Sequence, residues 1–290
     1  MAMPTKKIVK ITPEVERILR RAQMSDSTLV LREQLDRKVY DEVNKVIVAL
    51  GGKWNRGAKA HVFHRPFAEV LAEALDDGEV LDEKKTYDVY ETPDAVIERM
   101  LGCVRDTHWV QFAMEPSAGS GRLVKALRIR YPLLHISAVE IRDCVIGGEP
   151  DHVIRSDFLE VNPAVAFKGR LPPGGSFDLI FANPPFSNGL DVKHVSHMLR
   201  FARPKDHDLG VTRLVTIMSP SYSFNGKKES VAFRRWLGRR QRAGGDVRVI
   251  QLPEGTFAEM GTDVRSHLIA LDVTQDDRME LEGYLRELRS

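Results

Sequence analysis

Residues 177–186 read Phe177-Asp178-Leu179-Ile180-Phe181-Ala182-Asn183-Pro184-Pro185-Phe186. The first six residues are mostly apolar and have the length of a buried strand. This strand leads directly into Asn-Pro-Pro-Phe, where two prolines fix the backbone and remove two N–H donors. The Asn183 side-chain oxygen and the Pro184 carbonyl are then both free to accept hydrogen bonds from one NH2 group. The pattern predicts a pocket for a planar amine at the end of a buried strand.

Such a pocket suits the transfer of a group to an amino nitrogen. Two acceptors that draw both hydrogens away from a conjugated amine localise its lone pair and orient it toward an electrophile. Phe186 offers a flat face to the ring that carries the amine. An Asn-Pro turn beside a buried phenylalanine is the alternative interpretation, and the three motifs that precede this one along the chain argue against it.

Apolar runs alternate with helical patterns from about residue 88 onward. This alternation predicts an α/β domain with a mostly parallel sheet and helices on both faces. A ligand is then expected at the carboxyl ends of the strands, near a topological switch point. The expected strands are 111–114, 136–139, 177–182, 213–218, 247–252 and 267–271, and the expected helices are 93–104, 121–130, 189–202, 229–242 and 278–288.

The first of the preceding motifs is a turn of small residues, 115–121, which reads Glu-Pro-Ser-Ala-Gly-Ser-Gly between an expected strand and an expected helix. Its glycines let the backbone approach a ligand closely, because a Cβ would block that approach. The spacing is not the GxGxxG of a dinucleotide site, which disfavours a dinucleotide oxidoreductase. An ordinary tight turn is the alternative for this motif alone.

Two acids follow at the ends of later strands. Glu140, followed by Ile141, ends the next apolar run and is placed to accept hydrogen bonds from both hydroxyls of a ribose. Asp157 and Phe158 come next, and this pair suits an adenine ring through its exocyclic amine and its face. A solvated Glu140 and a helix-capping Asp157 are the alternatives when each is taken alone.

The four motifs in this order resemble the class I S-adenosylmethionine-dependent methyltransferases, in particular the DNA adenine-N6 family with an Asn-Pro-Pro-aromatic signature. The match extends over about 88–272, and Thr92-Pro93 resembles an upstream cofactor motif. The resemblance implies a Rossmann-like fold with a seven-stranded sheet, and S-adenosylmethionine as cofactor. The implied catalytic residues are Asn183, Pro184, Pro185 and Phe186. The implied cofactor contacts are Tyr90, Thr92, Pro93, Glu115, Ser117, Ala118, Gly119, Gly121, Glu140, Ile141, Asp157, Phe158 and Asn183.

The resemblance implies methyl transfer to adenine N6 in double-stranded DNA, with the base flipped out of the stack because a paired amine cannot reach the pocket. Cytosine N4, an RNA adenine and a glutamine amide of a protein are alternatives, since each presents a planar NH2. A non-catalytic DNA-binding protein with this fold is an alternative of another class. That alternative predicts an altered glycine turn or a lost Asn183, and both are intact.

The N-terminal part, 1–87, is expected to be a small, mainly helical appendage to the catalytic domain, 88–290. Helical spacing covers 13–23, 29–50 and 67–76, and an acidic run indicates a linker at 76–87. Many relatives carry a recognition domain after the catalytic domain, whereas only about 18 residues follow Asp272 here. DNA recognition is therefore expected from the appendage and from a basic insertion at 221–248.

Charge distribution supports a polyanionic partner, although the net charge is only +2. Basic side chains concentrate in two regions, 51–68 and 227–248, for which solvated faces are the alternative. Phe257 is a candidate to stack against the flipped base, with core packing as the alternative. Compact readers often serve palindromic sites as dimers, so a homodimer is compatible with this reading. The candidate DNA contacts are Lys53, Trp54, Asn55, Arg56, Lys59, Lys227, Lys228, Arg234 and Arg235.

Composition sets the remaining expectations. Of the 290 residues, 42% are hydrophobic and 29% are charged, which is typical of a globular chain with a substantial core. No apolar run approaches the roughly 18–20 residues that span a bilayer, and no secretory signal is evident. Cys103 and Cys144 lack CxxC spacing, so reduced thiols, no metal site and a cytoplasmic location are expected.

Overall fold

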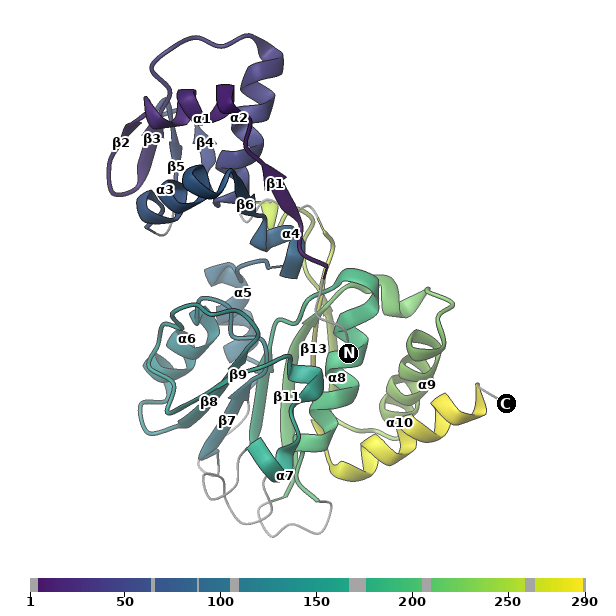
Figure 1. Ribbon diagram of the computed structural model, residues 1–290. Helices are drawn as coiled ribbons and strands as arrows, with labels where there is room; N and C mark the ends of the chain where they lie inside the picture. Colours follow the sequence, from purple (N-terminus) through teal and green to yellow (C-terminus); the bar gives the residue numbers. More distant parts are fainter. Residues whose placement is uncertain are drawn as a thin grey trace. The chain divides into compact units, whose positions relative to one another are not determined.

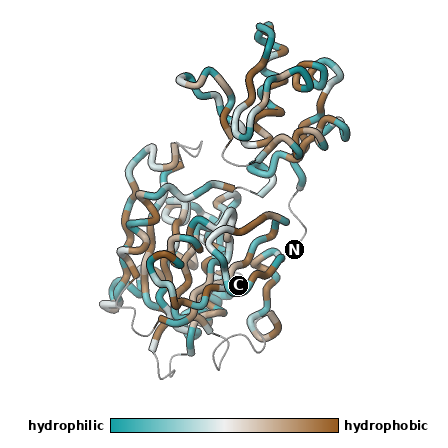
Figure 2. Tube along the Cα trace, turned by 90° about the vertical axis from the view of Figure 1, so that its left-hand side faces the viewer, coloured by the Kyte–Doolittle hydropathy of each residue, from teal (hydrophilic) through white to brown (hydrophobic). Residues whose placement is uncertain are grey.

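The computed structural model describes residues 5–63, 66–87, 89–104, 110–166, 176–204, 210–258 and 264–288. The chain divides into two units, Ala2–Val89 and Tyr90–Ser290 (Figure 1). This division lies two residues beyond the boundary expected from the sequence, after residue 87. In Figure 2, hydrophobic stretches of the chain run through the interior of each unit.

The C-terminal unit is built on a seven-stranded sheet in the order β12-β13-β11-β10-β7-β8-β9. Only β13 runs against its neighbours, and the other pairs are parallel. This arrangement confirms the predicted Rossmann-like fold, a mostly parallel seven-stranded sheet. The strands are β7 (Phe112–Glu115), β8 (His135–Glu140), β9 (His152–Arg155), β10 (Leu179–Ala182), β11 (Thr212–Met218), β12 (Val247–Gln251) and β13 (His267–Val273).

Helices cover both faces of this sheet. On β10, Ile180 packs with α8, α9 and α10, whereas Phe181 packs with α5 and α6 on the opposite face, because successive side chains of a strand point to opposite sides. The helices are α5 (Asp94–Leu101), α6 (Arg122–Arg130), α7 (Pro163–Ala166), α8 (Leu190–Met198), α9 (Lys228–Arg242) and α10 (Gln275–Glu287), with 3₁₀ turns η1 (Phe158–Glu160), η2 (Ser187–Gly189), η3 (Leu199–Phe201) and η4 (Pro220–Ser223).

Six of the seven strands coincide with apolar runs read from the sequence. The seventh, β9, was not predicted because it lies at the edge of the sheet and alternates partly buried with exposed residues. Residues 221–248, expected as a basic insertion, form η4, α9 and β12 instead. Helix α9 buries Phe233 and Trp236 against the sheet, so this segment is part of the core of the unit.

The N-terminal unit contains more helical than strand residues, as expected, together with two small sheets that were not predicted. One sheet pairs β1 with β6, and the other has the order β2-β3-β5-β4. The helices are α1 (Pro13–Arg20), α2 (Arg37–Ala49), α3 (Ala68–Asp77) and α4 (Glu83–Tyr87), and the strands are β1 (Ile8–Lys10), β2 (Gln23–Met24), β3 (Thr28–Val30), β4 (Lys53–Asn55), β5 (Ala60–Val62) and β6 (Glu79–Leu81).

Two expectations for this unit need correction. The helix expected over 29–50 begins only at Arg37, because the Asp36 side chain caps it and Leu29 is buried in β3, where it pairs with His61. The linker expected at 76–87 instead forms β6 and α4. Two of its acidic residues interact within the N-terminal unit. Asp76 pairs with Arg20 at 2.6 Å, and Asp82 accepts from the Lys85 backbone N–H at 3.0 Å.

Candidate active site

The carboxyl ends of β7, β8 and β10 meet at one edge of the sheet. The chain order changes direction at β7, since β8 and β9 lie on one side of it and β10 and β11 on the other. This is the switch point where ligands of open α/β sheets bind. Glu115 ends β7, Glu140 ends β8, and Asn183 directly follows β10, so three of the four motifs come together here.

The glycine turn is held against the end of β8 by two backbone donors. The Ala118 N–H donates to the Val139 carbonyl at 2.9 Å, and the Gly119 N–H donates to Glu140 Oε2 at 2.7 Å. Gly121 has a φ of 85°, and a Cβ added there would lie 2.2 Å from the Gly147 carbonyl oxygen. Only glycine fits this position, because the backbone is left-handed and two chain segments touch.

Glu115 is fully buried beneath this turn. Its Oε1 accepts from the Ser117 N–H at 2.9 Å, and its Oε2 has no hydrogen-bond partner among the described residues. Burial, and to a smaller extent the Glu140 charge, raise the pKa of Glu115 to about 8. The carboxyl group is therefore mainly protonated at neutral pH while no ligand lies beside it, and a cationic ligand group at its orphaned oxygen would favour the ionised form.

Glu140 is engaged by donors of the protein itself. Besides accepting from Gly119, it accepts at Oε1 from the backbone N–H and from Nε of Arg142, both at 2.9 Å. An ionised carboxylate has about four lone-pair sites, so three are occupied and about one remains for a hydroxyl group. The carboxylate is consequently rigid, and it also positions the glycine turn.

The Asn183 side chain is fixed by both N–H groups of its amide. Nδ2 donates to the Tyr90 carbonyl at 3.2 Å and to Thr92 Oγ1 at 3.0 Å. Neither Asn183 Oδ1 nor the Pro184 carbonyl accepts a hydrogen bond from any residue that the structure describes. Because both N–H groups of the Asn183 amide are used, Oδ1 and the Pro184 carbonyl remain available, and both are acceptors.

The segment that holds Asn183 is itself tied to the glycine turn. Arg122 Nε donates to the Thr92 carbonyl at 2.9 Å, and Ser120 Oγ donates to Glu91 at 2.8 Å. Pro93 is the N-cap of α5, and its carbonyl accepts from the Val96 N–H at 2.9 Å. The upstream Thr-Pro motif, the glycine turn and the Asn-Pro-Pro tip thus form one connected structure.

Asp157 and Phe158 are placed differently from the adenine pocket implied by the resemblance. Asp157 Oδ1 accepts from the Leu159 N–H at 2.9 Å and caps η1, which was the alternative interpretation of this residue. Phe158 is buried, and its ring lies 4.9 Å from the His197 ring and 5.3 Å from the Phe201 ring. In this conformation Phe158 packs in the core.

Sequence reasoning did not find His194, which lies on α8 beside the glycine turn. Its Nδ1 is 3.3 Å from Ser117 Oγ, and burial lowers the pKa of His194 to about 3. The imidazole is therefore neutral and braces Ser117 by a hydrogen bond rather than by charge. A single histidine on a helix gives no sequence signal of this kind, since Ser117 is distant along the chain.

The candidate substrate residues of the C-terminal unit are mostly engaged within the protein. Phe257 is only 2% exposed and packs in the core, which was the alternative to stacking on a base. Arg234 Nη1 donates to the Tyr222 and Asn225 carbonyls, both at 2.7 Å. Arg235 lies 3.6 Å from Glu287 on α10. Lys227 and Lys228 remain exposed.

The candidates of the N-terminal unit lie on the hairpin of β4 and β5. Lys53, Trp54 and Asn55 form β4, an edge strand, and Trp54 is 51% exposed. Asn55 Oδ1 accepts from the Ala58 N–H at 3.0 Å and shapes the turn, which carries the exposed Arg56 and Lys59. His64 and Arg65 of the same basic region lie outside the described residues.

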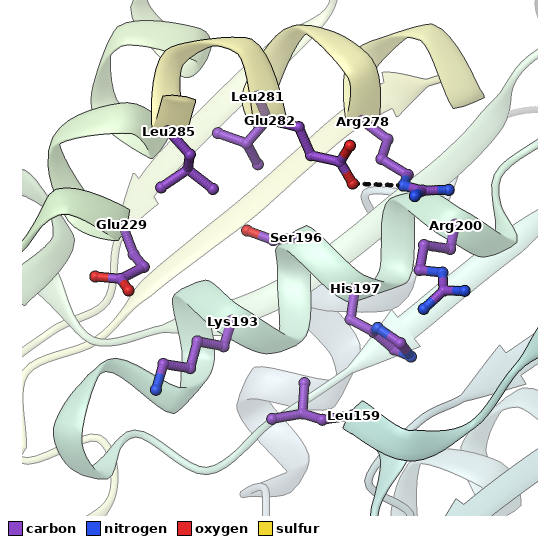
Figure 3. Close-up of a pocket in the computed structure, with 10 residues that line it drawn as sticks. All are labelled: Leu159, Lys193, Ser196, His197, Arg200, Glu229, Arg278, Leu281, Glu282 and Leu285. Carbon is purple, nitrogen blue, oxygen red and sulfur yellow. Dashed lines mark hydrogen bonds and ion pairs between the residues drawn. The ribbon is translucent and has the colours of Figure 1, made fainter. Parts of the chain in front are cut away.

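A separate cleft of about 270 Å³ lies between α8 and α10 (Figure 3). Its lining mixes charges, including Lys193 and Glu229, and Arg278 donates to Glu282 across one wall at 2.8 Å. No motif residue predicted from the sequence lines this cleft, so it is distinct from the strand-end site.

The described residues contain no group of three or more His, Cys, Asp and Glu side chains placed to hold a metal ion. Within the same part of the chain, every helix is too short or too polar to cross a membrane.

Comparison with known proteins gave structural similarities only. No family model matches the chain, and no curated protein matches it. The 23S rRNA methyltransferase ErmE is 15% identical with a TM-score of 0.43, covering 68% of this chain and 76% of that one. The N-methyltransferase NodS from Bradyrhizobium japonicum WM9 is 11% identical with a TM-score of 0.38, covering 62% and 95%. The plantazolicin methyltransferase BpumL, in complex with SAH, is 11% identical with a TM-score of 0.36, covering 62% and 86%.

Proposed function

We propose that this protein transfers a methyl group from S-adenosylmethionine to an exocyclic amine of a nucleobase, adenine N6 in double-stranded DNA being the proposed target. The observation that carries the proposal is the orientation of the Asn183 amide. Its two N–H groups are bound by Tyr90 and Thr92, so Oδ1 and the neighbouring Pro184 carbonyl are left as a pair of acceptors. Such a pair selects a group with two hydrogens on one nitrogen.

The tip residues prepare this amine for attack. Accepting both hydrogens localises the nitrogen lone pair, and fixed acceptors in a half-buried site need no reorganisation during the reaction. Phe186, which is half-buried beside the tip, supports the ring that carries the amine. The nitrogen forms its bond to the methyl carbon as the carbon–sulfur bond breaks and its electron pair goes to sulfur, and the nitrogen then releases one proton to water.

The strand-end site suits the proposed cofactor. S-adenosylmethionine supplies a methyl group already activated on a sulfonium sulfur, so the protein needs no strong base before attack. The orphaned Oε2 of Glu115 would accept from its ammonium group once that charge favours loss of the carboxyl proton, and the open lone-pair site of Glu140 fits a ribose hydroxyl. Gly119 and Gly121 both have positive φ, and Gly121 lets the turn touch Gly147.

The hairpin of β4 and β5 supports nucleic acid as the substrate class. Arg56 and Lys59 form no ion pair with a described residue and flank the exposed Trp54. Basic groups next to an exposed aromatic ring suit phosphate contacts and base stacking. For the proposed duplex target, the base would be flipped out of the stack to reach Asn183.

A labelling experiment tests the proposal. The protein is incubated with tritiated S-adenosylmethionine and, in separate reactions, with methylation-free genomic DNA, total RNA and protein extract, and the modified nucleoside is identified. We expect N6-methyladenine in DNA. Asn183→Ala is expected to abolish transfer while keeping cofactor affinity within about tenfold, since the backbone and Glu115 contacts remain.

The same experiment separates the alternatives. N4-methylcytosine would move the target to another base, label only in RNA would move it to another polymer, and label only in protein would overturn the nucleic-acid proposal. Loss of cofactor binding in Asn183→Ala would show that Asn183 does not have the proposed role. Absence of transfer to any of the three substrates would favour a non-catalytic protein.

A further inference from the structure

An exposed aromatic side chain lies on the segment between β11 and α9. Phe224 is 76% exposed, whereas its near neighbour Tyr222 is buried. Burying a phenylalanine side chain is worth roughly 1.5–3 kcal/mol, so an exposed one is left in water at a cost. A single exposed apolar residue is common on protein surfaces. Phe224 is of interest because hydrogen bonds fix the backbone around it.

The backbone on both sides of Phe224 is firmly held. Arg234 Nη1 donates to the Tyr222 and Asn225 carbonyls, both at 2.7 Å, and so bridges across Phe224. The Asn225 N–H donates to the Ser221 carbonyl at 2.8 Å. Tyr222 Oη lies 2.9 Å from His267 Nδ1 on β13. These bonds hold the backbone of Phe224 in a defined place, and its ring is exposed there.

That place is next to the catalytic tip. Strands β10 and β11 are parallel neighbours, and the segment begins at Ser219, whose N–H donates to Asp191 Oδ2 at 2.9 Å. It ends at Lys227, whose Nζ donates to the Asn188 carbonyl at 3.2 Å. Asn188 and Asp191 both follow Phe186 closely in the chain. The segment is therefore attached at two points, to η2 and to the start of α8, which directly follow the Asn-Pro-Pro motif, with Phe224 between them.

The charge around Phe224 is unlike that of the rest of the basic stretch. Along α9, Arg239 lies 2.5 Å from Glu280, and Arg240 lies 3.5 Å from Asp277, so acids of α10 neutralise these two arginines. Lys227 and Lys228 are exposed and form no ion pair with a described residue. An aromatic ring beside ammonium groups that no described acid neutralises suits a nucleotide, whose base stacks and whose phosphate is anionic.

We infer that Phe224 is a substrate-binding residue on which a base of the nucleic-acid substrate stacks, with Lys227 and Lys228 contacting the adjoining phosphates. This inference rests on the proposed function and adds a residue to it. It also assigns to Phe224 a contact that the buried Phe257 cannot make in this conformation.

The test compares Phe224→Ala and Phe224→Trp with wild type in methyl transfer to methylation-free genomic DNA and in binding of a fluorescein-labelled random 30-base-pair duplex. Loss of stacking in Phe224→Ala is expected to raise KM and Kd for DNA about fivefold or more, while Kd for S-adenosylmethionine stays within about twofold. Phe224→Trp is expected to retain wild-type KM, because an aromatic face remains.

Leu133→Ala is the matched control. Leu133 is 99% exposed and lies just before β8, at the amino ends of the strands and thus at the opposite edge of the sheet, so KM for DNA should not change. If wild type methylates DNA and Phe224→Ala keeps the wild-type KM and Kd, the inference is wrong and the proposed function stands. If wild type transfers no methyl group to nucleic acid, it is the proposed function that fails.

Discussion

Asn183 and Thr92 are joined by a hydrogen bond of 3.0 Å from Nδ2 to Oγ1 across 91 residues of sequence. This bond, together with the one to the Tyr90 carbonyl, decides which atom of the Asn183 amide faces the substrate. In the proposed function, Thr92 would act on the amine through Asn183 and would be a positioning residue. Arg122, at the start of α6, in turn holds the backbone of Thr92.

Replacement of Thr92 by valine tests this arrangement. Valine has nearly the same shape but no acceptor, so one amide N–H loses its partner and the orientation of Oδ1 is less restricted. A hydrogen bond of this kind is worth about 0.5–1.5 kcal/mol, so the single-turnover rate of methyl transfer should fall about two- to tenfold. Thr92→Ser keeps Oγ and should retain the rate. Equal rates in the two variants would rule out the positioning role.

The protonated Glu115 predicts a pH dependence of stability. Its pKa is raised from an ordinary 4.5 to about 8, so the folded state holds a proton that the unfolded state releases between these values. This contribution is complete below about pH 4.5 and is lost as the pH rises to about 8. Glu115→Gln carries no such proton. As the pH rises across this range, the free energy of unfolding of Glu115→Gln minus that of wild type, both measured with urea, should increase by on the order of 1 kcal/mol per pH unit. Parallel pH profiles would contradict the assignment.

Gly121 and Gly244 form a matched pair for testing the close approach of the glycine turn. Both have positive φ, 85° and 74°, but an added Cβ strikes Gly147 at the first and meets nothing within 4 Å at the second. Gly244→Ala should cost about 1–2 kcal/mol of stability through its backbone alone. Gly121→Ala should cost about 1–3 kcal/mol more and weaken cofactor binding. Similar thermal shifts in both variants would show that the turn relaxes freely.

The basic residues differ in their predicted effect on the salt dependence of DNA binding. Replacing Arg56 and Lys59 together by alanine should weaken binding and reduce the slope of log Kd against log salt by about 2, since each is expected to contact one phosphate. Arg235 and Arg239 already face Glu287 and Glu280, so their double alanine variant should keep the wild-type slope. A reduced slope in the Arg235 and Arg239 double variant, with a wild-type slope in the Arg56 and Lys59 double variant, would show that α9 and not the hairpin contacts the DNA.

The local patterns of the sequence were enough for the core of the fold. Six strands and the helices between them were readable because a buried strand and an amphipathic helix each impose a short repeat on neighbouring residues. The edge strand β9 and the small sheets of the N-terminal unit were missed, since short, half-exposed strands depend on partners distant in sequence. Leu29 looked helical by spacing, yet its partner His61 makes it part of a strand.

By itself, the sequence determined the fold class and the tip Asn183-Pro184-Pro185-Phe186, because prolines act on their own backbone wherever they occur. Only the tertiary structure decided which way the Asn183 amide faces, since its partners Tyr90 and Thr92 belong to another segment. It also decided which side chains are available to a substrate. Arg239 and Arg240 of α9 pair with acids of α10, Phe257 is buried and Phe224 is exposed. Charge pairing and burial depend on which segments the fold brings together, so local sequence patterns do not contain them.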